Sequence, residues 1–414
     1  MIFVGLDWAE EHHDIALMSE AGDVLTEFRV GDEAAGVEAI HAAVAQHRAA
    51  AEERVLVGTE SVHGLVAQAL VAAGYELYEI NPLASNRYRD RHSLAGAKSD
   101  RGDARMLADV VRTDRHNHRA FQGDSDLSEA VQVLARAHQS LIQRRQTEIN
   151  SLRSTLRGYY PQLLQAFPKL ASPSSRDCLD AMAVIERAPT PERGRTLSQL
   201  QIGAALRRAG RRLSIAARAQ EVRDALHQPQ LPGPPTLTTG AYGVMARATA
   251  RVIVAMSEQI AELGAEMNAH FEKHPDAKII LSLPGLGPVL GARVMGEFGD
   301  APNRYADARA RKNYATTAPV TRASGKLRLI HARHAGNRIL GDACLRWAFS
   351  AVQSSPGAGR YYRTLRGREK SHAQATRTVA NRLVGILHGC LEHRTLYSEV
   401  RAWPEPESPS GAAA

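Results

Sequence analysis

Apolar and polar positions follow two different patterns along the chain, and the change between them falls near residue 122. Before it, short apolar runs typical of β-strands lie at residues 2–6, 15–18, 24–30, 54–60 and 75–80. Longer amphipathic stretches at residues 34–50 and 64–73 predict helices between the later strands. Three strands, a helix, a strand, a helix and a strand, followed by further helices, predict an α/β domain over residues 1–122.

After residue 122 the spacing of apolar residues becomes helical. Residues 124–167 carry one apolar stripe and residues 244–271 a second, each with steps of about three and four residues. Shorter helices are expected within residues 176–227, 338–353 and 376–390, and a Pro- and Gly-rich linker at 229–240. We therefore expect an all-α second half. It comprises a helical, coiled-coil-like oligomerisation region at 123–275, a mostly helical C-terminal domain at 276–400 and a disordered tail at 401–414.

Composition narrows the class of partner. The chain of 414 residues has 52 Lys and Arg against 44 Asp and Glu, a formal net charge of +8. A polyanion such as nucleic acid is the natural partner, although a GC-rich genome produces the same excess of Arg. No apolar run is long enough to cross a membrane, and no signal peptide is recognisable. Three widely separated cysteines without a CxxC pair argue against a zinc site and fit a reducing cytoplasm.

Four acidic residues occupy positions at which an α/β fold gathers functional groups. Asp7 ends the first predicted strand and Glu60 ends the fourth, while Asp100 and Asp103 lie three residues apart near the start of a predicted helix at 103–112. Four ionised carboxylates in one place repel one another unless cations bind between them, and oxygen ligands suit Mg²⁺ or Mn²⁺. Two such ions about 4 Å apart are the usual device for phosphodiester chemistry.

Two segments of the second half suit contact with a nucleic-acid backbone. Pro284-Gly285-Leu286-Gly287, between two short helices, resembles a helix-hairpin-helix element, in which backbone N–H groups hold a phosphate. A plain glycine turn is the equal alternative. Residues 321–326 form a small polar loop by their composition, and a serine in such a loop is usually a turn residue. The local pattern does not distinguish Ser324 from Thr321, and no His or Asp is spaced for a hydrolase triad.

Taken in order along nearly the whole chain, these motifs resemble those of DEDD transposases from the insertion-sequence family guided by a bridge RNA, the IS110 type. The segments that carry the resemblance are Gly5-Leu6-Asp7-Trp8, Thr59-Glu60-Ser61, Ile80-Asn81-Pro82, Lys98-Ser99-Asp100, Asp103-Ala104, Pro284-Gly285-Leu286-Gly287, Ala323-Ser324-Gly325, Gly336-Asn337-Arg338 and Leu345-Arg346. Each is short, and their common order and spacing make the match specific.

The resemblance implies an RNase H-like N-terminal domain of the junction-resolvase type, with Asp7, Glu60, Asp100 and Asp103 as ligands of two Mg²⁺ or Mn²⁺ ions. It also implies that Ser324 is a nucleophile that forms a phosphoserine bond to DNA, activated by metal-bound carboxylates of a partner subunit. The implied partners are donor DNA, target DNA and a structured bridge RNA. They would be held by a homo-oligomer, a dimer or tetramer, in the bacterial cytoplasm at the nucleoid.

We expect the contacts to nucleic acid to come from basic side chains, an amide and exposed backbone N–H groups. The residues concerned are Lys98, Arg101, Gly285, Gly287, Arg322, Lys326, Arg328, Asn337 and Arg338.

Two other interpretations use the same residues differently. A metal-dependent nuclease, such as a Holliday-junction resolvase, would use the four acids with water as nucleophile and leave Ser324 structural. A non-catalytic nucleic-acid-binding protein would keep the acids solvated or paired with Arg. The ordered set of four acids disfavours the binding protein, whereas the serine segment and the family resemblance separate the transposase from the nuclease.

Overall fold

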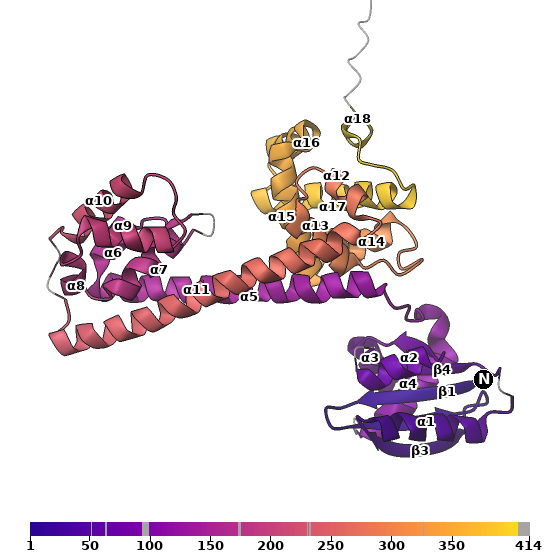
Figure 1. Cartoon of the computed structure of the whole chain (residues 1–414). Helices are drawn as coiled ribbons and strands as arrows, with labels where there is room; N and C mark the ends of the chain where they lie inside the picture. Colours follow the sequence, from indigo (N-terminus) through magenta and orange to yellow (C-terminus); the bar gives the residue numbers. More distant parts are fainter. Residues whose placement is uncertain are drawn as a thin grey trace, which may run out of the picture. The chain divides into compact units, whose positions relative to one another are not determined.

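The chain folds into two compact units, residues 1–123 and 124–414, which are described separately (Figure 1). The computed structural model describes residues 1–50, 52–62, 64–92, 99–172, 175–229, 231, 233–325 and 327–404. Within these ranges the first unit contains all but two of the strands, and the second unit is predominantly helical. The structure thus confirms the expected change from an α/β domain to a helical region.

The first unit is built on a five-stranded mixed sheet. Its strands are β1 (Ile2–Trp8), β2 (His12–Met18), β3 (Val24–Gly31), β4 (Val55–Thr59) and β5 (Glu76–Glu79). The spatial order is β3-β2-β1-β4-β5, with β1 antiparallel to β2 and parallel to β4. β2 is antiparallel to β3, and β4 is parallel to β5. This is the sheet of an RNase H-like domain, as the sequence predicts.

Helices cover both faces of this sheet. On one face α1 (Ala34–His47) and α2 (Leu65–Ala72) pack against the alternate strand residues that include Ile2, Val4 and Leu6. On the other face α3 (Pro82–His92) and α4 (Asp100–Asp114) pack against residues that include Phe3 and Leu56, and a short 3₁₀ helix at Arg115–Asn117 follows α4. Both faces of the central strands are therefore buried, which explains their continuous apolar runs.

Two glycines allow α4 to lie directly on the sheet. Gly5 of β1 and Gly58 of β4 are opposite one another in the parallel pairing. A Cβ atom on Gly5 would lie 1.7 Å from the carbonyl oxygen of Ala104, and one on Gly58 would lie 2.4 Å from that of Leu107. Because no side chain can occupy either position, the backbone of α4 approaches the strands closely. This close approach fixes the position of the first turn of α4.

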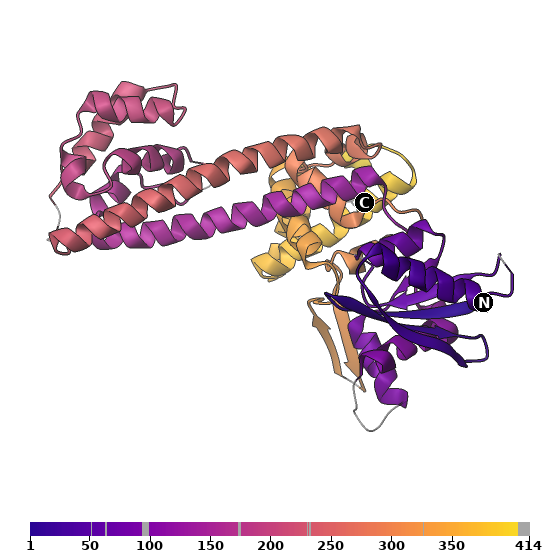
Figure 2. The same ribbon diagram turned by 60° about the horizontal axis from the view of Figure 1, so that its bottom comes forward.

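The second unit is organised by two long helices, α5 (Asp126–Tyr159) and α11 (Thr236–Lys273). They run antiparallel, because Arg145 of α5 donates a hydrogen bond to Ser257 of α11 and Tyr159 stacks on Tyr242. Both views show them side by side along much of their length (Figures 1 and 2). They are the two apolar stripes recognised in the sequence.

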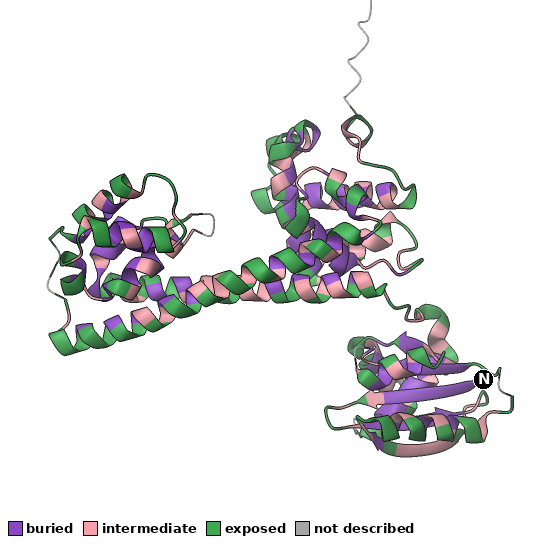
Figure 3. Ribbon diagram, in the orientation of Figure 1, coloured by how far each residue is buried: buried purple, intermediate pink, exposed green. Residues whose placement is uncertain are grey.

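One helical cluster lies at each end of this pair, and each has its own apolar core (Figure 3). The first cluster contains α6 (Pro161–Ala166), α7 (Asp177–Arg187), α8 (Pro191–Arg195), α9 (Gln199–Arg208) and α10 (Ile215–Leu226). The second contains α12 (Ala277–Ser282), α13 (Pro288–Phe298), α14 (Ala308–Tyr314), α15 (Arg338–Ser354), α16 (Pro356–Gly367), α17 (His372–Glu392) and α18 (Glu399–Ala402). The further boundary expected at residue 275 stays a prediction.

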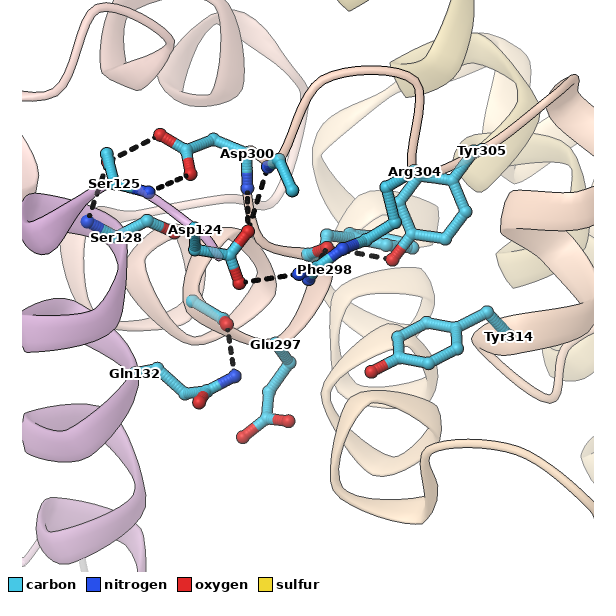
Figure 4. Close-up of polar contacts among 12 residues, drawn as sticks. Asp124, Ser125, Ser128, Gln132, Glu297, Phe298, Asp300, Arg304, Tyr305 and Tyr314 are labelled. Carbon is cyan, nitrogen blue, oxygen red and sulfur yellow. Dashed lines mark hydrogen bonds and ion pairs between the residues drawn. The ribbon is translucent and has the colours of Figure 1, made fainter. Parts of the chain in front are cut away.

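A polar corner fixes the start of α5 to the segment after α13 (Figure 4). The carboxylate of Asp124 accepts hydrogen bonds of 2.8 Å from the backbone N–H groups of Asp300 and Ala301 and pairs with Arg304 at 2.9 Å. Ser125, the N-cap of α5, donates to Asp300 in turn. Several polar contacts therefore hold the N-terminus of α5 against the segment that follows α13.

Three local expectations differ from the structure. The long helix predicted at 124–167 is interrupted at Tyr160, which separates α5 from α6. The linker predicted at 229–240 is shorter, because α11 already begins at Thr236. The segment expected to be a loop at 321–326 instead begins with four residues of β6 (Val320–Ser324), which forms an antiparallel hairpin with β7 (Leu327–His331).

The expectation of a disordered tail from residue 401 is wrong for residues 401–404. Trp403 is 4% exposed, and the guanidinium of Arg382 lies over its ring, 4.3 Å from the centroid. An aromatic ring buried against a cation belongs to the folded unit. Residues 405–414 lie outside the described residues.

Substituting Gly5 with Ala is expected to destabilise the first unit by about 1–3 kcal/mol or more, because the new methyl group overlaps the backbone of α4. Urea denaturation followed by circular dichroism measures the change. Gly31→Ala is the matched control, since the nearest atoms to a Cβ at Gly31 are those of the flexible Glu33 side chain, at 3.4 Å and beyond. Equal stability of the two variants would show that the close approach is unimportant.

Candidate active site

Asp7 and Glu60 lie at the carboxyl ends of neighbouring parallel strands. Leu6 pairs with Thr59 in the β1–β4 register, so the next residues, Asp7 near the end of β1, where it still pairs with β2, and Glu60 just after β4, are neighbours at this edge of the sheet. Side chains alternate along a strand, which places Asp7 on the same face as Gly5 and therefore beneath α4. Both acids are half-buried. The structure thus brings together the two acids predicted at strand ends.

The first turn of α4 supplies the other two acids. The helix begins at Asp100, three residues earlier than the sequence analysis places it, because Ser99 is its N-cap and accepts a hydrogen bond of 3.2 Å from the N–H group of Gly102. Asp100 and Asp103 share a face of this turn, where carboxylates are favoured by the helix dipole. Asp103 is 6% exposed, whereas Asp100 is exposed.

Crowding of these carboxylates changes the acidity of Asp7. The pKa of Asp7 is raised to about 6, first by burial and then, in decreasing order of size, by the neighbouring charges of Asp103, Glu60, Asp100 and Asp14. All three other predicted acids therefore act on Asp7 electrostatically. The surrounding protein stabilises the ionised form of this carboxyl group poorly. A bound cation would stabilise that form by direct attraction to its negative charge.

Arginine side chains balance part of this negative charge. Arg89 of α3 pairs with Asp103 at 2.6 Å. Arg29 of β3 pairs with Asp14 at 2.7 Å and reaches Asp100 at 3.5 Å. The site therefore contains both the acids and guanidinium groups, which are also suited to binding phosphate.

Sequence reasoning missed two members of this cluster, His12 and Asp14. Ligand atoms of His12, Asp14 and Asp100 lie within 4.8 Å of one another. Asp14 is 2% exposed and is opposite Asp7 in the antiparallel β1–β2 pairing. The pairing of the first two predicted strands could have identified Asp14, because a short connection between them places Asp14 opposite Asp7.

The donor set suits a divalent metal ion. It consists of carboxylate oxygens with one imidazole at its edge, and hard divalent cations prefer oxygen ligands. Asp7, Glu60, Asp100 and Asp103 are the residues that would hold such an ion, and its charge would relieve the repulsion that raises the pKa of Asp7.

Ser324 lies in the second unit, at the end of β6. The hairpin of β6 and β7 is exposed on both faces, and Ser324 pairs with Leu327 across the turn. Arg322 and Arg328 are exposed on the two strands. No described residue forms a hydrogen bond to the Ser324 hydroxyl, so the hydroxyl is available to a ligand at the tip of a basic hairpin.

The remaining residues expected to contact nucleic acid have different environments. Arg101 and Arg338 are exposed, on the first turns of α4 and α15. Gly287 is exposed as the N-cap of α13, whereas Gly285, with φ of +80°, packs against α15, where a Cβ would lie 2.6 Å from the N atom of Ala351. Lys98 and Lys326 lie outside the described residues.

Asn337 is partly committed to the protein itself. Its side chain caps α15 by accepting a hydrogen bond from the N–H group of Leu340 at 3.0 Å, and it donates to Glu297 at 2.6 Å. Contact with nucleic acid through this side chain stays a prediction, and so do the roles of the other residues.

An RNase H-like sheet that gathers acids at its strand ends, joined to a helical unit, fits the class of metal-dependent enzymes that act on phosphodiester bonds of nucleic acid. Residues 4–161 match the family model described as DEDD_Tnp_IS110 transposase, and residues 277–363 match the model of the transposase IS116/IS110/IS902 family. The chain therefore belongs to the IS110 family of DEDD transposases and is a DNA transposase.

Several individual proteins of insertion elements are similar to this chain over most of its length. The mini-circle putative transposase for IS117 of Streptomyces coelicolor is 40% identical over 405 residues, which cover 97% of this chain and 96% of the relative. An uncharacterised 44.8 kDa protein of the insertion element IS116 of Streptomyces clavuligerus is 30% identical over 417 residues, with 96% of each chain covered. An uncharacterised 43.6 kDa protein of IS110 from Streptomyces coelicolor is 30% identical over 342 residues, 78% of each chain.

Among the helices that the structure describes, none combines the length and the apolar character needed to span a membrane.

Substituting Asp7 with Asn is expected to stabilise the first unit at pH 8 in the presence of a chelator, by about 1 kcal/mol once the half-exposure of the side chain is allowed for. The folded pKa of about 6 exceeds the ordinary value of 3.8, so the stability contributed by the protonated group is complete below pH 3.8 and is lost as the pH rises through 6. The gain should therefore vanish towards pH 4, as measured by urea denaturation across this pH range.

The exposed Asp90, changed to Asn, is the control and should show no such gain. Added Mg²⁺ should stabilise the parent protein and leave Asp7→Asn nearly unaffected, because a ligand stabilises the state that binds it. A parent protein that is more stable than Asp7→Asn at pH 8 without metal would contradict the crowding of the acids.

Proposed function

We propose that this transposase cuts and rejoins DNA by a phosphoserine intermediate, and that a bridge RNA selects the DNA. The observation that carries the proposal is the Ser324 hydroxyl, which lies on an exposed hairpin that also carries Arg322, on the same face, and Arg328, on the other face, and which forms no hydrogen bond within the described part of the chain. The acid cluster around Asp7 supplies the second half of the chemistry. Family membership supports the pairing of the two.

In the proposed reaction the Ser324 oxygen attacks a DNA phosphorus atom. A bond forms between serine and phosphorus, the bond from phosphorus to one deoxyribose oxygen breaks, and the serine proton is removed while the released oxygen gains one. The reverse reaction, with a hydroxyl from another strand, restores both serine and phosphodiester. Because each step exchanges one phosphoester bond for another, the energy of the DNA backbone is conserved in the covalent intermediate.

Asp7, Glu60, Asp100 and Asp103 would bind two divalent ions, Mg²⁺ or Mn²⁺, next to the reacting phosphate. These ions would supply Lewis-acid stabilisation of the negative charge that develops on the phosphate oxygens. Arg322 and Arg328 would hold the DNA backbone near Ser324. We propose that the acids and the serine that act together come from different subunits of a dimer or tetramer in the bacterial cytoplasm, at the nucleoid.

The net charge of +8 supports binding of donor DNA, target DNA and a structured RNA through their backbones. In this proposal base pairing with the RNA selects the sequence, whereas the protein recognises shape and phosphate. Little direct contact with base edges is then required of the protein.

A hydrolytic nuclease is the second candidate. It is favoured by one observation, that the acid cluster is complete within the first unit without Ser324. Water would then be the nucleophile, and the products would be free DNA ends.

Substituting Ser324 with Ala is expected to abolish covalent attachment of DNA to the protein and strand joining, while DNA binding is retained, because a single hydroxyl is removed from an exposed site. The measurement is a denaturing protein gel with labelled junction DNA, RNA and Mg²⁺. Thr321→Ala is the matched control, since Thr321 is an exposed hydroxyl residue of the same strand, and should keep the labelled band.

Asp7→Asn should lose both the covalent band and cleavage in either mechanism, whereas the two mechanisms differ at Ser324. DNA cleavage by Ser324→Ala at the rate of the parent protein, with no covalent band at short or long times, would replace the recombinase with the hydrolytic nuclease.

Removing the RNA is expected to abolish the preference for a particular target sequence and to leave nonspecific DNA binding that falls steeply with salt. Filter binding to matched and scrambled targets, with and without RNA at several salt concentrations, measures both effects. Equal sequence preference with and without RNA would contradict guidance by RNA.

A further inference from the structure

The hairpin of β6 and β7 has an exposed tip and a tightly held base. Residues 321–325 are exposed, and so are the apolar side chains of Leu327 and Ile330, at 59% and 68%. A two-stranded hairpin has little stability of its own in water. Its direction must therefore be determined where it joins the helical unit.

The two chain segments at the base are bound to each other and to the helices. On the entering side, the Thr317 hydroxyl donates to the carbonyl oxygen of Lys312 at 3.2 Å. On the leaving side, the N–H group of Asn337 donates to the carbonyl oxygen of Tyr314 at 2.9 Å. Gly336, with φ of +137°, permits this contact, because a Cβ there would lie 2.8 Å from the same oxygen.

A chain of three side chains holds the leaving segment. The Nδ2 group of Asn337 donates to Oε2 of Glu297 at 2.6 Å, while its Oδ1 caps α15. Glu297, on the last turn of α13, is 1% exposed. Its carboxylate also accepts two hydrogen bonds from Arg136 of α5, at 2.7 and 3.0 Å. One buried carboxylate thus connects α5, α13 and the start of α15.

The turn that carries Glu297 is itself fixed. Gln132 of α5 donates to the carbonyl oxygen of Gly296 at 2.8 Å. Arg304 and Tyr305 donate to the carbonyl oxygen of Phe298 at 3.1 and 2.8 Å (Figure 4). The carbonyl groups on both sides of Glu297, which a helix end leaves without partners, are therefore satisfied by side chains. The carboxylate lies on a support that cannot shift without breaking these bonds.

We propose that Arg136, Glu297 and Asn337 are positioning residues that set the direction of the hairpin and thereby the place of Ser324. This inference rests on the proposed function, in which Ser324 is the nucleophile. A buried carboxylate without partners is costly, so the chain of contacts defines one arrangement of the base. A nucleophile displaced by about 1 Å can lose about a hundredfold in rate, which makes such a support consequential.

The test uses substitutions that keep the helix cap. Asn337→Asp can still cap α15 but places a second carboxylate against Glu297. We expect the rate of covalent DNA attachment, measured at saturating DNA so that any change in affinity does not contribute, to fall about tenfold to a hundredfold. In the double variant Glu297→Gln, Asn337→Asp the amide at 297 can donate to the carboxylate at 337, which restores the hydrogen bond in the opposite direction. This variant should recover most of the rate.

Two further variants separate positioning from stability. Ser198→Ala removes the capping box of α9 in the other helical cluster, so it lowers stability and should leave the rate unchanged. Arg136→Lys keeps the positive charge but loses the bidentate pair of hydrogen bonds to Glu297. It is the milder variant to use if Asn337→Asp does not fold. It should reduce the rate by a smaller factor.

A distance measurement tests the same idea without any reaction. Cys178, Cys344 and Cys390 are buried, so spin labels can be directed to Leu327→Cys on the hairpin and Phe349→Cys on α15, both exposed positions. Electron paramagnetic resonance should give a narrow distance distribution in the otherwise unchanged protein and a broad one in Asn337→Asp. The Glu297→Gln, Asn337→Asp protein should be narrow again.

The outcomes distinguish the two proposals. An unchanged distance distribution and an unchanged attachment rate in Asn337→Asp and Arg136→Lys would overturn the positioning role. Covalent attachment that persists in Ser324→Ala would overturn the proposed nucleophile, while the distance distributions would still decide whether the three residues direct the hairpin.

Discussion

The active-site region of the first unit depends on the contact between the backbone of α4 and a pair of glycines. Gly5 and Gly58 lie opposite one another on neighbouring strands, and neither position has space for a Cβ atom. The helix therefore lies against the strands closely enough for the carboxylates of its first turn to influence Asp7. Two missing side chains thus determine where the acids lie, which determines how strongly they repel one another and how well a cation can bind.

The acids of the first unit and the serine proposed as nucleophile lie in different structural surroundings. The acids of the first unit lie at the ends of central strands of a sheet that is buried on both faces and on the first turn of the helix packed against it, and arginines from α3 and β3 balance part of their charge. The serine of the second unit lies on an exposed hairpin whose base is bound to several helices. Buried packing holds the crowded carboxylates close together, whereas an exposed hairpin with a fixed base leaves the proposed nucleophile accessible to a large substrate.

Much of the first unit could be predicted from the sequence, because continuous apolar runs and acids at strand ends are local signals. The role of Gly5 could not, since a close approach depends on a helix about a hundred residues further along the chain. Asp14 was missed because its partner is found through strand pairing rather than through a motif.

The hairpin was missed because its apolar residues face solvent, so no alternation of buried and exposed positions marks it. The basic segment that precedes α4 contains α3, whose polar composition conceals a helix. Ser324 was selected by family resemblance and not by its surroundings.

The antiparallel course of α5 and α11 has a consequence for how such proteins diversify. The chain leaves the second core along α5, builds the cluster of α6 to α10, and returns along α11 beside its point of departure. Because each cluster has its own core, a change in the cluster of α6 to α10 need not disturb the packing around the β6–β7 hairpin. We expect this cluster to tolerate changes in length and sequence that the cluster carrying the hairpin does not.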